Sequence, residues 1–101
     1  MILPYTTRAA HNVDALVTHF LDERRPRPEA VRSLFRALTE ASAAILTGTA
    51  TVYDAPRPYP ELKQPGTCWV YFEPYWIAYR RPKAPVIASV FYDESDIPGR
   101  F

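Results

Sequence analysis

Six side chains in the second half of the chain have the types that could cleave RNA without a metal ion. They are Arg57, Lys63, Arg80, Arg81, Tyr92 and Arg100. A metal-free ribonuclease must stabilise a pentavalent phosphorane and move two protons, and such side chains can do both if they converge within hydrogen-bond reach. Arg57, Arg80, Arg81 and Tyr92 are therefore the catalytic candidates.

The same residues also fit a surface that only binds. Arg81 opens the stretch "RPKAP", which reads as a turn between two strands, where solvated charges are expected. Tyr92 is followed by Asp93, Glu94 and Asp96, which put negative charge beside any bound phosphate. From the residue types alone, an active site and a binding surface both remain open.

The sequence predicts no metal site and no cofactor. His11 and His19 lie about two helical turns apart, and no Cys, Asp or Glu completes a zinc-ligand pattern around them. Cys68 has no partner motif for nucleophilic catalysis and is expected to be a small core residue. The 3 glycines of the chain include no phosphate-binding loop.

Composition indicates one globular domain that spans residues 1–101. The chain has 48% hydrophobic and 23% charged residues, as in ordinary folded proteins. Its net charge of +1 gives weak support for a nucleic-acid binder, because phosphate binding needs a basic face. It has 1 cysteine, no apolar run near the roughly 20 residues of a membrane span, and no signal-peptide pattern at its start. We therefore expect a cytoplasmic protein.

The first half of the chain predicts a short strand and two helices. Residues 1–5 read as a strand, with Pro4 at a sheet edge or strand end. Thr6 or Thr7 can cap a helix that Pro26 stops. Pro28 suits the first turn of a second helix, and Gly48 fits the residue just past its end. The short turn between the helices predicts an antiparallel hairpin.

Each predicted helix has one apolar stripe that should face the core. The stripe of the first helix contains Val13, Leu16, Val17, Phe20 and Leu21. The stripe of the second contains Val31, Leu34, Phe35, Leu38, Ile45 and Leu46. These positions follow the helical spacing of i, i+3, i+4 and i+7.

The second half of the chain predicts a proline-rich loop and three strands. Residues 49–66 contain prolines that remove backbone donors and favour an extended path. Three runs of aromatic and β-branched residues follow, separated by Glu73-Pro74 and by residues 81–85. The predicted fold is α+β, with a helical hairpin packed on one face of a three-stranded antiparallel meander.

These elements together resemble the RelE/ParE superfamily of bacterial toxins. The resemblance runs through the hairpin, "PRPYPEL", "WVYFEPYWIAYRR" and "PVIASVFYDESDIPGRF", and its specific part is the strand pair "PYWIAYR" and "VIASVFYD". It implies a toxin of a type II toxin–antitoxin module that inhibits growth or maintains a plasmid. It also implies a hetero-oligomer with a cognate ParD-like antitoxin, which has a disordered C-terminal segment.

Two branches of the superfamily differ in activity. RelE-like members cut messenger RNA in the ribosomal A site, whereas ParE-like members poison DNA gyrase. RelE-like members are very basic and have an arginine after the first tyrosine of the central strand. In this sequence, Trp76 follows the corresponding tyrosine, Tyr75. We therefore interpret the chain as ParE-like and not an enzyme. A RelE-like endoribonuclease, or a degenerate toxin that only binds antitoxin, remains the alternative.

The resemblance also suggests two contact surfaces. The antitoxin is expected to meet Arg24, Arg25 and Arg32 with acidic residues. The expected contacts to the target, DNA gyrase, are Trp76, Arg80, Arg81, Tyr92, Arg100 and Phe101.

Overall fold

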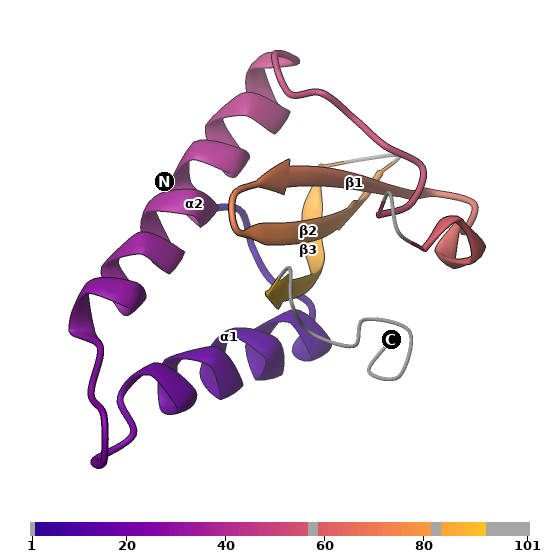
Figure 1. Ribbon diagram of the computed structural model, residues 1–101. Helices are drawn as coiled ribbons and strands as arrows, with labels where there is room; N and C mark the ends of the chain where they lie inside the picture. Colours follow the sequence, from indigo (N-terminus) through magenta and orange to yellow (C-terminus); the bar gives the residue numbers. More distant parts are fainter. Residues whose placement is uncertain (1, 57–58, 82–83, 93–101) are drawn as a thin grey trace.

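Two helices precede an antiparallel sheet in the computed structural model, which describes residues 2–56, 59–81 and 84–92. The helices are α1 (Thr7–Phe20) and α2 (Pro28–Thr47), and a short 3-10 helix, η1 (Pro60–Leu62), follows them. The strands are β1 (Thr67–Phe72), β2 (Tyr75–Arg80) and β3 (Val86–Tyr92). The α+β order is confirmed, and Figure 1 shows α1 and α2 diverging from their connecting turn.

The helix ends follow local sequence signals, with one exception. The Thr6 hydroxyl accepts the Ala9 N–H at 3.1 Å and caps α1, as predicted. Pro28 opens α2, and Gly48 ends it in the left-handed conformation, at φ 72°. The prediction that Pro26 stops α1 is wrong, because α1 already ends at Phe20. In the described part of the chain, no helix has both the length and the apolar character to cross a bilayer.

The segment before α1 is not the strand predicted for residues 1–5. Among residues 2–5, only Tyr5 forms a bridge, parallel to Ile87 of β3. The Ile87 N–H donates to the Pro4 carbonyl at 2.9 Å, and the Thr6 N–H donates to the Ile87 carbonyl at 2.8 Å. Because Pro4 has no N–H and Thr6 already caps α1, the pairing stops after one residue. The bridge nevertheless fixes the start of α1 beside β3.

The three strands form the predicted antiparallel meander, in the order β1-β2-β3. Tyr75 pairs with Tyr92 at one end of the β2–β3 ladder, and Arg80 pairs with Val86 at the other. The register shifts between Ala78 and Tyr79. This register sets which side chains can meet in a functional site.

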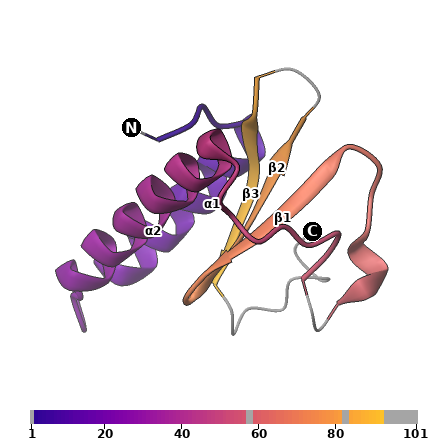
Figure 2. The ribbon, with the colours of Figure 1, turned by 90° about the horizontal axis from the view of Figure 1, so that it is seen from above.

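Both helices cover one face of the sheet, as Figure 2 shows from above. Phe20 of α1 is 3% exposed, which confirms its predicted place in the core. Phe35 of α2 is 37% exposed, so its predicted core position is wrong. Its neighbours Leu34 and Leu38 fill the space against the sheet instead, and Phe35 lies on the outer edge of the stripe. Leu21 and Leu46 are exposed as well.

The opposite face of the sheet has a second, aromatic core that the sequence did not predict. It consists of Trp69, Trp76, Ala78, Ala88 and Phe91. Tyr53, Tyr59 and Leu62, from the segment between α2 and β1, pack against it. The proline-rich stretch is therefore a loop, as predicted, but it also covers the sheet.

Candidate functional site

The candidates for RNA cleavage lie at opposite ends of the sheet. Arg80 is the last residue of β2 and pairs with Val86, whereas Tyr92 ends β3 and pairs with Tyr75. The seven residues from Val86 to Tyr92 span about 20 Å of extended strand. Arg81 directly follows Arg80, so both arginines are far beyond hydrogen-bond reach of Tyr92. The catalytic set proposed from residue types therefore does not converge.

The residues predicted to contact a target are not all on the surface. Trp76 is 4% exposed, and its ring lies 5.4 Å from that of Tyr53 and 4.8 Å from that of Tyr71. The loop that crosses this face of the sheet covers the Trp76 ring, so little of it is exposed to a target. Arg80 and Arg81 are exposed. Three further candidates lie outside the described residues: Arg57, Arg100 and Phe101.

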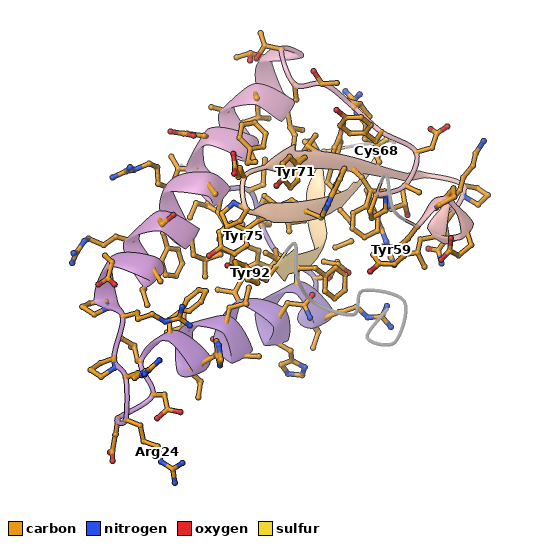
Figure 3. The ribbon with its side chains drawn as sticks, viewed as in Figure 1. Arg24, Tyr59, Cys68, Tyr71, Tyr75 and Tyr92 are labelled. Atoms are coloured by element: carbon orange, nitrogen blue, oxygen red, sulfur yellow. The ribbon has the colours of Figure 1, made fainter. Side chains whose placement is uncertain are left out.

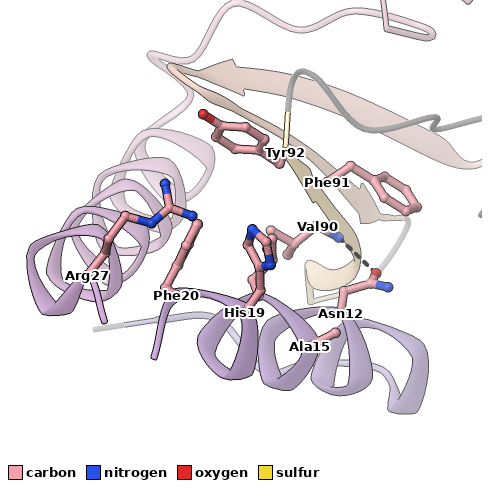
Figure 4. Close-up of a pocket in the computed structure, with 9 residues that line it drawn as sticks. Asn12, Ala15, His19, Phe20, Arg27, Val90, Phe91 and Tyr92 are labelled. Atoms are coloured by element: carbon pink, nitrogen blue, oxygen red, sulfur yellow. Dashed lines mark hydrogen bonds between the residues drawn. The ribbon is translucent and has the colours of Figure 1, made fainter. Parts of the chain in front are cut away.

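A groove runs between α1 and the end of β3, and we call it the α1–β3 groove (Figure 4). It encloses about 230 Å³. The residues that line it are Asn12, Ala15, Leu16, His19, Phe20, Arg27, Val90, Phe91 and Tyr92. Asn12 accepts the Val90 N–H at 3.1 Å and ties α1 to the edge of β3. The groove therefore has a fixed wall on each side.

Four of the side chains around this groove form a continuous row of contacts. The Arg27 guanidinium carbon lies 5.1 Å from the centre of the Phe20 ring. The Phe20 ring meets Tyr92 edge-on at 6.4 Å, and Tyr92 lies 5.8 Å from Tyr75. Figure 3 shows Tyr75 and Tyr92 next to one another. A cation over an aromatic ring is worth about 0.5–1 kcal/mol at an exposed site, so Phe20 helps to hold the guanidinium at the groove.

The electrostatics of this row centre on Arg27. Burial raises the pKa of the Tyr75 hydroxyl, Tyr92 raises it further, and the positive charge of Arg27 lowers it. Arg27 therefore acts on Tyr75 through space. The groove combines an apolar floor, a guanidinium and an imidazole, which suits an apolar side chain flanked by a carboxylate.

The turn between the helices adds further positive charge beside the groove. His19, Asp22, Arg24, Arg25 and Arg27 line a shallow hollow that shares His19 and Arg27 with the groove. The Asp22 carboxylate accepts the Arg24 N–H at 2.9 Å and so shapes the turn. Figure 3 shows Arg24 at the outer tip of this turn.

The three arginines predicted to bind antitoxin do not all lie at the same surface. Arg24 and Arg25 lie together beside His19 and Arg27. Arg32 is exposed on α2 and is not among the described residues that line either hollow.

The sequence patterns did not mark His19, Arg27 and Asn12 as site residues. His19 and Arg27 flank the turn of a helical hairpin, and residues on the two sides of such a turn must lie close together. His19 also precedes Phe20, the end of the inward stripe of α1. Those two signals could have placed His19 and Arg27 in one site, whereas nothing in the sequence marks Asn12.

The fold of the chain is similar to that of a known structure. No protein-family model matches the chain, and no curated protein matches it. The structure is similar to a chain of the chromosomal ParDE TA system from P. aeruginosa, with a TM-score of 0.64 and 18% sequence identity. The match covers 93% of this chain and 97% of that chain. The chain has a RelE/ParE-like fold.

Within this RelE/ParE-like fold, the sequence candidates separate into two surfaces. The α1–β3 groove lies at the Tyr92 end of β3, whereas Arg80 and Arg81 lie near the Val86 end. The likeness at 18% identity concerns the fold alone.

Proposed function

We propose that this chain is the toxin of a type II toxin–antitoxin module of the ParE kind. A cognate ParD-like antitoxin would hold it inactive in a hetero-oligomer in the cytoplasm. The likeness of nearly the whole chain to a chain of the ParDE TA system from P. aeruginosa supports this proposal. The target of the freed toxin is proposed to be DNA gyrase.

The register between β2 and β3 favours gyrase over RNA as the proposed target. It places Tyr92 about 20 Å of strand away from Arg80, so these groups cannot surround one phosphorane. The net charge of +1 agrees, since docking to ribosomal RNA gains most of its affinity from a basic surface. We therefore assign Arg80, Arg81 and Tyr92 to binding, together with Arg100 and Phe101 outside the described residues.

The α1–β3 groove and the adjoining turn are proposed as the antitoxin surface. The groove offers a half-enclosed apolar floor with Arg27 in its lining, and Arg24 and Arg25 line the adjoining hollow. A partner helix that carries one apolar anchor and flanking acidic residues fits this arrangement. Such a segment could be disordered before it binds.

Two assays with the purified chain test the target. In the first, gyrase and plasmid are mixed with the protein, and relaxed, supercoiled and cleaved plasmid are separated. In the second, messenger RNA is translated with the protein present, and its ends are mapped. We expect inhibited supercoiling or trapped cleavage with intact messenger. Cleaved messenger with unaffected gyrase would overturn the gyrase proposal and favour a RelE-like nuclease.

A further inference from the structure

A second hollow, lined by a different set of residues from the α1–β3 groove, lies towards the Val86 end of the sheet. It has a volume of about 380 Å³. Residues from α1, from the approach to β1 and from all three strands line it. Its polar lining includes Thr7, Arg8, Gln64, Thr67, Arg80 and Ser89, and we call it the Arg80 pocket.

The lining of the Arg80 pocket suits an anion. Arg8 and Arg80 contribute guanidinium groups from two different elements, and no Asp or Glu is among the described residues that line the hollow. Thr7 and Thr67 add hydroxyl donors. Arg80 is exposed, and no ion pair or hydrogen bond of its side chain is formed with the described residues. Its charge is therefore available to a ligand.

Ser89 adds a hydroxyl group to the floor of the pocket. It is 2% exposed, and its hydroxyl forms no hydrogen bond within residues 2–56, 59–81 and 84–92. Ser89 pairs with Ala78 on β2, and both residues line the pocket, so the hydroxyl faces the hollow. The other buried serine, Ser42, accepts the Leu3 N–H at 3.0 Å. The Ser89 hydroxyl therefore has no competing partner among the described residues and can donate to an acceptor bound in the hollow.

We propose that the Arg80 pocket binds a phosphate group. The Arg80 guanidinium would supply charge-assisted hydrogen bonds, and the Ser89 hydroxyl would donate from the floor. The start of α1 adds the positive end of a helix dipole to the two arginines. The hollow is larger than a phosphate ion needs, so the phosphate could belong to a nucleotide or to a nucleic-acid strand. This site is distinct from the antitoxin groove and does not depend on the gyrase proposal.

Titrations followed by backbone amide NMR test the proposal on the full purified chain at low ionic strength. The probes are inorganic phosphate, ATP and a short single-stranded RNA. We expect saturable shifts at the amides of Thr7, Arg8 and Ser89. Shifts with all three probes would show that the phosphate group alone is recognised, and tighter binding of RNA or of ATP would identify the source.

Three variants make the test specific. Arg80→Gln should weaken binding of each effective probe about tenfold or more, since a hydrogen bond to a charged group is lost. Ser89→Ala should weaken it severalfold. Arg36→Gln removes the same charge from the exposed face of α2 and should leave the affinity unchanged. Absence of saturable shifts at Thr7 and Ser89, or an equal loss in Arg36→Gln, would overturn the proposal.

Discussion

The ring of Tyr92 lies 5.8 Å from the ring of Tyr75, its cross-strand partner at the groove end of the sheet. The same ring meets Phe20 of α1 edge-on. Tyr92 thus has a packing role between α1 and the sheet that needs its ring and not its hydroxyl. This separates the two toxic mechanisms experimentally.

The first prediction is that Tyr92→Phe inhibits growth about as strongly as the wild type. Binding to a protein target depends on a few anchors, and the substitution keeps the ring. Growth after induction is the measurement, with mapping of messenger ends in the same cells. A ribonuclease that used this hydroxyl would lose about a hundredfold to ten-thousandfold in cleavage. Messenger cleavage that disappears in Tyr92→Phe would therefore contradict the gyrase proposal.

The second prediction contrasts two phenylalanines on the helices. Phe20→Ala should lower the free energy of unfolding by about 3–5 kcal/mol, because Phe20 is 3% exposed between α1 and the sheet. Phe35→Ala should cost less than about 1.5 kcal/mol, since much of that ring is already in water. Urea denaturation of the two variants measures the difference. Equal midpoints would show that the core is not arranged as described.

Local signals were enough to predict most of the fold. Thr6, Pro28 and Gly48 each have a backbone role that depends on few neighbours, and the structure has all three where expected. Phe35 was misplaced because its helical stripe is wider than the face that the sheet can cover. At the edge of such a stripe, tertiary packing decides which residue is buried.

The site was harder to predict, because it depends on strand register and on loop coverage. Residue types alone put Arg80 and Tyr92 in one set, and only the pairing of Arg80 with Val86 shows that they lie apart. Trp76 was predicted to contact the target, because no periodic pattern in the sequence reveals that Tyr53 covers its ring. Both facts arise from contacts between distant parts of the sequence.

The third prediction compares the two buried serines. Ser42→Ala should destabilise the protein by about 1–3 kcal/mol, because the buried Leu3 N–H loses its acceptor. Ser89→Ala should be close to neutral, because its hydroxyl forms no hydrogen bond with the described residues. Thermal unfolding without added phosphate measures both. If Ser89→Ala destabilises as much as Ser42→Ala, the hydroxyl has a structural partner and the argument for the Arg80 pocket weakens.

The fourth prediction concerns alkaline pH. Burial raises the pKa of Tyr75 above its ordinary value, so the folded chain keeps this proton at a pH where the unfolded chain releases it. Its contribution to stability is complete below about pH 10, the ordinary value for tyrosine. It is lost as the pH rises through the folded-state pKa. Tyr75→Phe should therefore make the unfolding free energy fall less steeply above about pH 10. Urea titrations at several alkaline pH values measure how the unfolding free energy depends on pH. The same dependence in Tyr75→Phe and in the wild type would contradict the prediction.

The last prediction tests the antitoxin surface by charge reversal. Arg27→Glu places negative charge in the α1–β3 groove, and Arg24→Glu with Arg25→Glu places it in the adjoining hollow. Acidic antitoxin residues are proposed to bind at both. Each change should weaken antitoxin binding about tenfold or more at low salt, and the difference should shrink at high salt as the charges are screened.

Arg32→Glu provides the matched comparison, because Arg32 is also exposed but is not among the described residues that line the groove or the adjoining hollow. The geometry predicts a smaller effect for it than for Arg27→Glu, although the sequence grouped Arg32 with Arg24 and Arg25. Affinities come from co-purification with the partner followed by titration, and circular dichroism checks that each variant is folded. Unchanged affinity in Arg27→Glu at low salt would remove the groove from the antitoxin interface. Equal losses in Arg32→Glu and Arg27→Glu would instead mean that the antitoxin reads the overall charge of the helical hairpin, with no anchor in the groove.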